Sequence, residues 1–378
     1  MYINFWYPIG TSDEVKADEP LRSQLFGLNF VAFRDKQGVA HVLSDTCVHR
    51  GGSLSKGWIK DGCVVCPYHG WQYEGDGKCT TVPSIGLDGK PPARAKVDSY
   101  PVQEKYGIVF AFLGDLPEQE RPALYEIPEW GKEGWRTHEL IILDVDYYYE
   151  RSMENGIDPA HNEFVHPTQG FAGTRDDYYV RNFEIEEWPL GCGLTLVMES
   201  SAKKDEVGKK FRDFDSQTTA ITGTYGPNTL ITFVHFTPEK WLHQYFFEAP
   251  LDGDRTRIYF INMRNMLLEP DYDEGVKKQN LMVADQDITV LSELNPIRTP
   301  DNNTKEIMMP ADKVVLRYRE WLKEWENNGW RIDAHALKEK QGDVAFAIPC
   351  PERRTSGNWV LDTVPLMPAV RHHKAAAE

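Results

Sequence analysis

Two short cysteine-histidine pairs near the N-terminus constrain this chain more than any other feature of its sequence. The pairs are Cys47-x-His49 and Cys66-x-x-His69, and sixteen residues separate His49 from Cys66 in a stretch rich in Gly and Pro. Each pair offers one thiolate and one imidazole. This donor set suits a tetrahedral zinc ion, or a [2Fe-2S] cluster in which two histidines replace two cysteines on one iron. The sequence therefore predicts two loops that share one metal centre.

The composition is that of an acidic globular protein. Its 378 residues suggest two or three domains, and 41% hydrophobic residues are enough to bury a sizeable core. The net charge of −16 argues against nucleic acid as a partner, because phosphate binding needs clustered Lys and Arg. No run approaches the roughly 18 apolar residues of a membrane span, and residues 1–10 do not resemble a secretory signal. We therefore expect no membrane association and a cytoplasmic location.

The cysteines outside the two pairs have no regular spacing. Cys63, Cys79, Cys192 and Cys350 are expected to be ordinary thiols of a reducing compartment. Cys63 and Cys79 flank the second pair, so a disulfide between them is a weaker alternative.

The patterns before and after residue 125 predict two different domains. Residues 24–114 read as short strands separated by turns, with both metal loops between strands. Residues 116–133 carry three prolines and many charges, which indicates a domain boundary. Beyond it the pattern predicts helices over residues 145–154, 273–294 and 311–327, with Gly156 breaking the first of them. We expect an α+β chain, with an all-β domain over residues 1–125 and a domain of antiparallel sheet and helices over residues 126–378.

A second group of candidate ligands lies in the second domain. Asn155, Asp158, His161 and His166 fall within twelve residues. On one continuous helix His161 and His166 would point about 140° apart. Pro167 and the residue before His166 suggest that the helix ends between the histidines, so that both can reach one metal. Alternatively, Asp158 only caps a short helix and the histidines are ordinary polar residues.

A third ligand is expected from the helix predicted over residues 273–294. Val283, Val290, Leu291 and Leu294 form an apolar stripe, and Asp287 lies within it. A carboxylate on a buried face is costly unless it is paired or bound to metal. Asp285 lies about 200° around the helix and should face outward. Two imidazoles and the Asp287 carboxylate would form the facial triad of non-haem Fe(II) oxygenases.

These motifs resemble those of a known family. The segments His49-Arg50-Gly51-Gly52 and Pro67-Tyr68-His69-Gly70-Trp71 resemble the two loops of a Rieske [2Fe-2S] domain. Asn155-x-x-Asp158-x-x-His161-x-x-x-x-His166 and the segment 286–291 resemble the iron-binding segments of its catalytic domain. Over nearly its whole length the chain resembles the catalytic α subunit of a Rieske non-haem iron oxygenase.

The resemblance implies a role for each of these residues. Cys47, His49, Cys66 and His69 would hold the [2Fe-2S] cluster, and His161, His166 and Asp287 would hold a mononuclear Fe(II). Asn155 and Asp158 would be catalytic residues beside that iron, in a helix-grip domain. The resemblance further implies a head-to-tail homotrimer, in which His69 faces Asp158 of a neighbouring subunit and Asp158 holds His161.

The reaction implied by the family uses O₂ and external electrons. The sequence has no Gly-x-Gly-x-x-Gly run, so NAD(P)H would act indirectly, through a separate reductase or ferredoxin. The opening Trp6-Tyr7-Pro8-Ile9-Gly10 is more similar to vanillate O-demethylase-like monooxygenases than to naphthalene-type dioxygenases. We expect hydroxylation or oxidative O- or N-dealkylation of a small, largely apolar organic substrate. The residues that could line its pocket are Val197, Phe233, His235, Tyr245, Phe247 and Tyr259.

Three other functions stay open from the sequence. A cis-dihydroxylating aromatic-ring dioxygenase would use the same ligands. A Rieske electron carrier fused to a binding domain would lack the mononuclear iron, although a carrier needs only about the first third of this length. A zinc-stabilised interaction module would have no iron at all.

Overall fold

The computed structural model describes residues 1–370 except 87, 170, 172, 181–182 and 199–217. It divides into two compact units. The first consists of Met1–Leu124 together with Lys323–Glu378, and the second of Tyr125–Leu322. We expected residues 126–378 to form one domain. The structure instead groups the C-terminal segment with the first unit.

Buried polar contacts hold the C-terminal segment on the first unit. Asp98 is fully buried, and the Arg353 guanidinium donates to both of its carboxylate oxygens, at 2.5 and 2.8 Å. The Tyr100 hydroxyl donates to the Ile348 carbonyl at 2.9 Å, and the Lys96 ammonium pairs with Glu352. A buried carboxylate is costly without such a partner, so the pairing with Arg353 favours this arrangement.

The first unit consists mainly of three small antiparallel sheets. In strand order, the first sheet contains β1 (Phe5–Thr11), β11 (Ile108–Leu113) and β10 (Val102–Lys105). The second contains β2 (Leu21–Leu25), β3 (Leu28–Arg34), β4 (Ala40–Ser44) and β9 (Ser99–Tyr100). The third contains β5 (Trp58–Lys60), β6 (Cys63–Val65), β7 (Gln72–Tyr73) and β8 (Cys79–Thr81). The C-terminal segment adds α6 (Ala334–Glu339) and the parallel pair β20 (Phe346–Ala347) and β21 (Asp362–Thr363). One apolar core includes Val31, Leu54, Val64 and the two cysteines Cys47 and Cys66.

The second unit is built on an eight-stranded antiparallel sheet. Its strands are, in spatial order, β12 (Arg136–Thr137), β19 (Thr256–Arg264), β18 (Trp241–Pro250), β17 (Thr229–His235), β16 (Thr218–Tyr225), β15 (Gly191–Met198) and β14 (Ile185–Trp188), and β13 (Ile141–Val145) also pairs with β19. This sheet and its helices confirm the α+β expectation for the second unit. Among the described residues, no helix combines the length and apolar character needed to cross a membrane.

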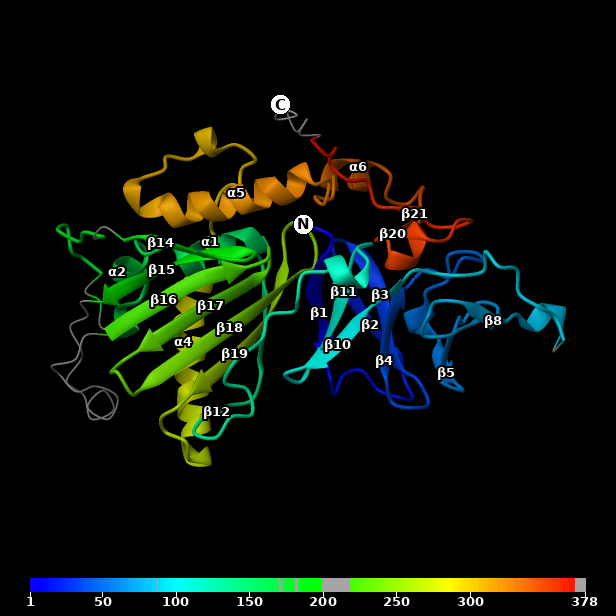
Figure 1. Cartoon of the computed structure of the whole chain (residues 1–378), viewed down its shortest axis with the longest axis horizontal. Helices are drawn as coiled ribbons and strands as arrows, with labels where there is room; N and C mark the ends of the chain where they lie inside the picture. The colour runs from blue at the N-terminus through cyan, green and yellow to red at the C-terminus, as the bar shows by residue number, and fades with distance from the viewer. Residues whose placement is uncertain (87, 170, 172, 181–182, 199–217, 371–378) are drawn as a thin grey trace, which may run out of the picture. The chain divides into compact units, whose positions relative to one another are not determined.

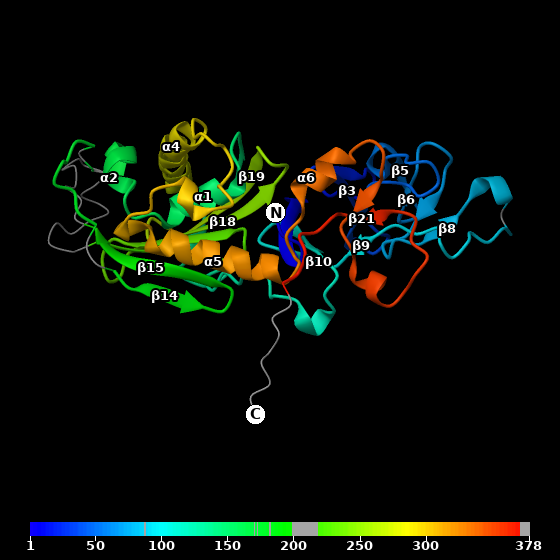
Figure 2. The same ribbon diagram turned by 90° about the horizontal axis from the view of Figure 1, so that it is seen from above.

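Helices cover one face of this sheet. They are α1 (Tyr149–Ile157), α2 (Asn162–Val165) and α4 (Asp273–Leu291), and the boundary between the units falls within α5 (Lys313–Asn327). α1 contacts β16, β17 and β18 as well as α4, which also contacts α2. Figures 1 and 2 show α1, α2 and α4 on the same side of the strands. The metal-ligand candidates of this unit all come from these three helices and the turns beside them.

The start of α1 differs from the expectation. We predicted a helix over residues 145–154, but Val145 ends β13 opposite Thr256 of β19, and the helix begins at Tyr149. Gly156 does not break the helix. A Cβ atom added there would lie 2.2 Å from Leu230 Cδ2, so the glycine lets α1 approach β17 closely.

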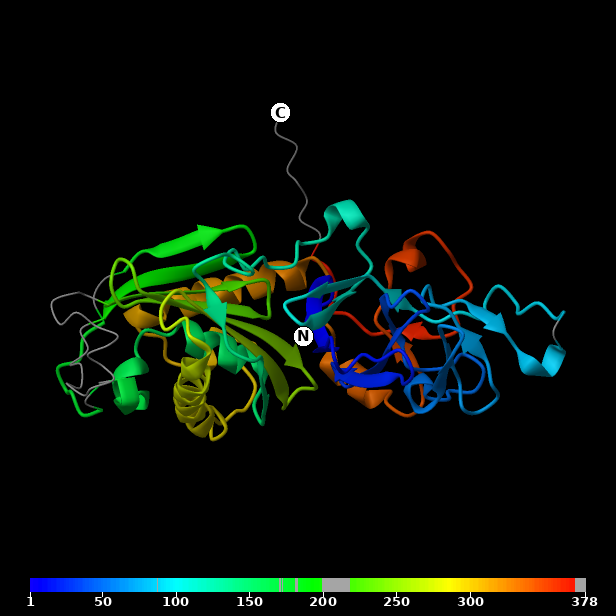
Figure 3. The same cartoon turned by 90° about the horizontal axis from the view of Figure 1, so that it is seen from below.

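The register of the sheet assigns each side chain to one face. The Ser152 hydroxyl of α1 donates to Glu248 at 2.7 Å, so Glu248 faces the helices and its neighbour Phe247 faces away. The register also puts Tyr245, Tyr259, Phe233, His235 and Val197 on the face with Phe247. All six residues considered for the substrate pocket therefore lie on the sheet face opposite α1 and α4. In Figure 3, α4 (yellow) lies on the side of the sheet that these residues do not face.

Candidate metal centres

The two cysteine-histidine loops have the same backbone turn. In the first loop the Cys47 amide donates to the Gly52 carbonyl at 2.8 Å, and the Gly51 amide donates back to Cys47 at 2.9 Å. The second loop repeats this pattern with Cys66, Trp71 and Gly70, at 2.8 and 3.0 Å. Gly51 and Gly70 have φ values of 70° and 72°, a region that glycine enters without strain. The glycines therefore let both loops close tightly around their ligands.

The loops bring the four candidate ligands together as a pair of histidines and a pair of cysteines, with one residue of each pair from each loop. His49 Nδ1 and His69 Nδ1 lie 3.1 Å apart, and both histidines are exposed. Cys47 and Cys66 are each only 2% exposed. A Cβ atom added at Gly52 would lie 2.9 Å from Cys66 Sγ, so the first loop lies directly against the second cysteine. One iron could take the histidine pair and the other the cysteine pair.

The chemistry of the cysteines fits this assignment. Burial raises the pKa of Cys47 to about 11, although Tyr73 hydrogen-bonds its sulfur at 3.1 Å. A thiolate at this buried position needs a positive partner, and a metal cluster supplies one. Cys63, Cys79, Cys192 and Cys350 were expected to be free thiols, and the structure agrees, since none of the six cysteines forms a disulfide bond.

The second group of ligands is arranged around the short helix α2. His161 is the residue before this four-residue helix and His166 is the residue after it. His166 has φ −112° and ψ 61°, which lies outside the helical region, and Pro167 follows it. The break turns the two imidazoles toward one another.

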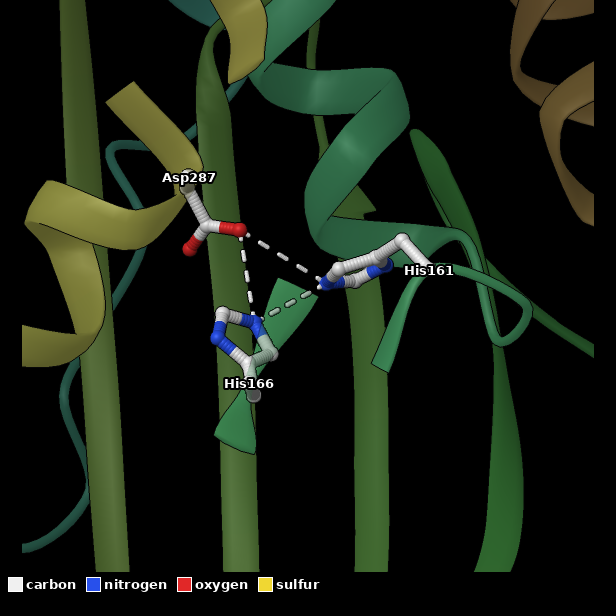
Figure 4. A group of neighbouring side chains, drawn as sticks. All are labelled: His161, His166 and Asp287. Carbon is white, nitrogen blue, oxygen red and sulfur yellow. Dashed lines mark hydrogen bonds and ion pairs between the residues drawn. The ribbon is translucent and has the colours of Figure 1, made fainter. Parts of the chain in front are cut away.

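α4 completes this group with Asp287 (Figure 4). The Nε2 atoms of His161 and His166 lie 3.2 Å apart. Asp287 Oδ1 lies 3.3 Å from His166 Nε2 and 3.7 Å from His161 Nε2. The three side chains are 14%, 4% and 23% exposed, for His161, His166 and Asp287 respectively. Asp285, the rejected alternative, is exposed.

Each of the three side chains has a partner that fixes its direction. His161 Nδ1 hydrogen-bonds the Asp158 carbonyl at 2.8 Å, and His166 Nδ1 hydrogen-bonds Gln286 Oε1 at 3.1 Å. Because both acceptors are oxygens, each Nδ1 carries the proton and each Nε2 presents a lone pair. Asn155 Nδ2 donates to Asp287 Oδ1 at 3.0 Å. Such contacts from outside the ligand set are typical of metal sites.

The electrostatics of this group also suit a cation. Burial lowers the pKa of His161, but the carboxylates of Asp158 and Asp287 outweigh that effect and raise it overall. The site thus favours positive charge between its nitrogen and oxygen atoms. Two imidazoles and one carboxylate fit a divalent iron that keeps open positions.

The Asp158 carboxylate has a local role as well. Its oxygens accept from the amides of Ala160, at 2.7 Å, and His161, at 3.2 Å, as in a capped turn. Oδ2 lies 3.7 Å from His161 Nδ1, so the close contact to this ring comes from the Asp158 backbone carbonyl. The contacts expected of a cap are therefore present, and the His161 ring is held by the backbone of Asp158 and not by its carboxylate.

Sequence reasoning did not assign a role to Gln286. Its side chain orients His166 from the position next to Asp287 on α4. The signal was available, because Gln286 begins the segment that resembles the family's third-ligand helix. Its partner could not be named without the packing of α2 on α4.

Two family models match the chain. Residues 5–101 match the Rieske [2Fe-2S] domain, and residues 145–328 match the vanillate O-demethylase oxygenase C-terminal domain. The first match includes both cysteine-histidine loops. The second includes His161, His166 and Asp287.

Three curated proteins are similar over most of this chain. The chain is 39% identical to chlorophyllide a oxygenase of Chlamydomonas reinhardtii over 90% of its own length and 50% of that protein. It is 30% identical to a probable 3-ketosteroid-9-alpha-monooxygenase oxygenase component of Rhodococcus rhodochrous, over 91% of this chain and 77% of that one. It is 33% identical to the 3-chlorobenzoate-3,4-dioxygenase oxygenase subunit of Comamonas testosteroni, over 68% and 57%. The chain thus spans about half the length of the chlorophyllide a oxygenase.

Solved structures show the same fold. NdmA of Pseudomonas putida CBB5 with caffeine has a TM-score of 0.70 and 22% identity, and the match covers 86% of this chain and 91% of that one. Dicamba monooxygenase bound to 3,6-dichlorosalicylic acid has a TM-score of 0.69 and 21% identity, with 85% and 96% covered. Together with the family models and the Rhodococcus relative, the fold leads to one conclusion. The chain belongs to the Rieske non-haem iron oxygenases, oxidoreductases that combine a Rieske [2Fe-2S] cluster with a mononuclear iron and use O₂.

Proposed function

We propose that this chain is the oxygenase component of a Rieske system and acts as a monooxygenase. One oxygen atom of O₂ enters a C–H bond of the substrate, and the other leaves as water after two electrons and two protons are taken up. When the carbon attacked bears oxygen or nitrogen, the hydroxylated product collapses with loss of the alkyl group. The observation that carries the proposal is the convergence of His161, His166 and Asp287 within 4.8 Å of one another.

In this proposal the metal ligands are divided between two sites. Cys47, His49, Cys66 and His69 hold the [2Fe-2S] cluster, while His161, His166 and Asp287 hold the mononuclear iron. When bound, the mononuclear iron supplies O₂ activation and the cluster supplies single electrons, which amino-acid side chains cannot do. The paired separations of 3.1 Å for the exposed imidazoles and 3.2 Å for the buried ones support this division.

The side chains around the mononuclear site keep its ligands in place. Asn155 holds Asp287 so that one carboxylate oxygen points at the two Nε2 atoms. The Asp158 carbonyl and Gln286 keep a proton on Nδ1 of His161 and His166, respectively, so that Nε2 stays a ligand atom. We propose Asn155 and Asp158 as the catalytic residues that support this site, with the Asp158 carboxylate facing His69 of a neighbouring subunit in a homotrimer.

We propose a ring-containing, largely apolar organic substrate. The three curated relatives are named for chlorophyllide, a ketosteroid and chlorobenzoate, which are all ring compounds. On the sheet face that carries α1 and α4, Thr232, Val234, Gln244 and Phe246 remain partly exposed and are candidates for the pocket floor. A role in the breakdown of aromatic compounds would follow from such a pocket. Electrons would come from NAD(P)H through a separate ferredoxin or reductase.

We propose a cytoplasmic location because the sequence is acidic and has cysteines without disulfides. The Chlamydomonas relative is named as chloroplastic. Fractionation of the source cells would distinguish the two compartments, since activity in the soluble cytoplasmic fraction is expected and activity confined to plastids would exclude the proposal.

Dihydroxylation is the second candidate, because the Comamonas relative is named as a dioxygenase subunit. Turnover under ¹⁸O₂ with a surrogate reductase separates the two reactions. We expect one labelled oxygen per product molecule. Two labelled hydroxyl groups in one product would exclude monooxygenation.

Iron analysis tests the proposal itself. An oxygenase with both sites filled contains three irons per chain, whereas an electron carrier with an inert binding domain contains two. The visible absorption of the cluster should be present in both cases. Two irons per fully loaded chain, with no oxygen incorporated into any product, would overturn the oxygenase function, and a colourless protein would indicate zinc.

A further inference from the structure

The sheet face opposite α1 carries a third pair of close imidazoles. His235 Nε2 of β17 and His243 Nε2 of β18 lie 3.0 Å apart. The separation resembles the 3.2 Å between the Nε2 atoms of His161 and His166. His243 is 6% exposed, whereas His235 is partly exposed. One ring is thus held in the interior and the other is accessible from solvent.

A buried carboxylate determines the tautomer of the inner ring. Glu129 Oε1 lies 2.6 Å from His243 Nδ1, and the Tyr245 hydroxyl donates to Glu129 Oε2 at 2.5 Å. Since an ionised carboxylate only accepts hydrogen bonds, His243 Nδ1 carries the proton. In the neutral ring Nε2 is then the acceptor, and it faces His235 Nε2. This is the carboxylate-histidine arrangement that commonly orients an imidazole toward a metal.

Glu129 is a buried carboxylate whose two oxygens accept hydrogen bonds from His243 and Tyr245. The residue is 7% exposed, and within the described part of the chain its ion pair is with His243. A buried negative charge is costly unless a positive charge lies nearby. A cation bound at His243 Nε2 would offset it through the ring.

We propose that His235 and His243 form a second mononuclear metal site, which takes a late first-row divalent ion of the Zn²⁺ type and is oriented by Glu129. Two bonds of about 2.0–2.1 Å from one zinc ion put their nitrogens roughly 3.0–3.4 Å apart. The two Nε2 atoms are already near this separation, and the rings, whose centroids lie 5.3 Å apart, turn so that both lone pairs point at the ion. Without the ion, His235 Nε2–H donates to His243. On binding, that proton moves to His235 Nδ1, and water fills the open positions on the accessible side.

The donor set distinguishes this site from the oxygenase site. In the triad the carboxylate reaches the Nε2 atoms, but here it lies behind the ring at Nδ1 and cannot become a third ligand. Two neutral imidazoles favour copper and zinc over ferrous iron. The ion would fasten β17 to β18 and to the segment that carries Glu129. The inference does not depend on the oxygenase reaction.

Zinc binding to the full-length, iron-loaded protein tests the proposal. Zn²⁺ is added at slightly more than one equivalent, free metal is removed, and bound zinc and iron are both measured. The wild-type protein should retain one zinc per chain more than the His235→Gln variant, with iron unchanged in both. Glutamine is chosen because its amide N–H can still donate to His243 Nε2 and preserve the fold. His335→Asn, which changes an exposed histidine, should bind zinc as the wild type does.

Two tryptophans provide a second measurement. The Trp241 ring lies 4.9 Å from His235, and the Trp135 ring lies 5.0 Å from His243. Ni²⁺ should therefore quench tryptophan fluorescence in the wild-type protein more strongly than in His235→Gln. Glu129→Gln should weaken zinc affinity about 10- to 100-fold. Equal zinc retention and equal quenching in the wild type and His235→Gln would overturn the proposal and leave a simple N–H···N hydrogen bond.

Discussion

The cluster loops and the triad both bring two imidazoles close together, but they do so by different means. In the loops, each ligand pair lies within four residues of sequence, and its turn is closed by two backbone hydrogen bonds. In the triad, His161 and His166 flank a short helix, while Asp287 comes from α4, far along the chain. The loop histidines are exposed, and the triad is largely buried.

The difference indicates how each site should respond to mutation. A loop is held by its own turn, so the loss of one ligand should leave the fold of the second unit unchanged. The triad depends on the packing of α1, α2 and α4, and each ligand there has its own orienting contact. We therefore expect the effects of substitutions around the triad to be graded by their distance from the metal position.

The largest effect is expected from Asp287→Ala. The substitution removes the one carboxylate of the triad, so the mononuclear iron should be lost and turnover abolished while the visible spectrum of the cluster remains. Asp285→Ala is the matched control, because Asp285 is exposed on the same helix. Iron analysis should give two irons per chain for the first variant and three for the second. Normal turnover by Asp287→Ala would contradict the ligand assignment.

Cys66→Ser should have an equally complete effect on the other centre. The cluster absorption should disappear because serine cannot replace a thiolate ligand, and the mononuclear site should still bind iron. Cys63→Ser is the control, since Cys63 lies on β6 outside both loops. Absorption spectra and iron content check both variants, and a retained cluster in Cys66→Ser would show that the loops do not hold it.

Asp158→Ala should retain the iron but reduce turnover by up to about 100-fold. The contact to His161 Nδ1 comes from the backbone carbonyl, which alanine keeps, so iron binding should survive. Asp158→Asn tests the charge alone, because asparagine can still accept from the Ala160 amide. If Asp158→Asn is as active as the wild type, capping is the main role of the side chain and the proposed bridge is wrong.

A smaller effect is expected from Asn155→Ala. This variant leaves all three ligands in place and removes the hydrogen bond to Asp287 Oδ1. Iron affinity should fall about 10-fold, as measured by iron loss to a chelator. An unchanged rate of loss would show that packing alone orients Asp287.

The last prediction concerns the stability of the fold on the triad side of the sheet. Burial raises the pKa of Glu248 to about 8, against a hydrogen bond from Ser152 that lowers it. Between about pH 4.5 and pH 8 the Glu248 carboxyl therefore stays protonated in the folded protein, whereas it is ionised in the unfolded chain. The contribution of Glu248 to stability should be fully present below about pH 4.5 and be lost as pH rises to about 8, at roughly 1.4 kcal/mol per pH unit. Urea unfolding between pH 5 and 8 should show a flatter profile for Glu248→Gln, whereas the exposed control Glu239→Gln should keep the wild-type slope.

Much of the two metal sites could be predicted from motifs of residues that lie close together in the sequence. The loop motifs and their glycines are local, and the structure gives both loops the same closed turn with positive φ at Gly51 and Gly70. The apolar stripe of α4 favoured Asp287 over Asp285, and the structure has Asp287 beside the histidines and Asp285 exposed. Val290, assigned to the same stripe, is 45% exposed, so the stripe is narrower than its sequence suggested.

Other features depended on contacts that sequence does not display. Val145 has strand neighbours only because β13 pairs with β19, and this delays the start of α1. Gly156 was expected to end a helix, yet it serves the close approach of Leu230. The sequence does not display the register of the strands, and this register puts the candidate pocket residues on the sheet face opposite α1 and α4.

The chain's own pattern was sufficient for the family, the two kinds of metal-binding motif and the α+β class, because these depend on residues close in sequence and on helical periodicity. Long-range packing determined the rest: which partner orients each ligand, which sheet face the helices cover, and that the segment after residue 323 joins the first unit. The physical reason is that a buried ion pair such as Asp98 with Arg353, or a hydrogen bond such as Asn155 to Asp287, forms between residues separated by more than one hundred positions. Their pairing becomes defined when the sheets and helices pack.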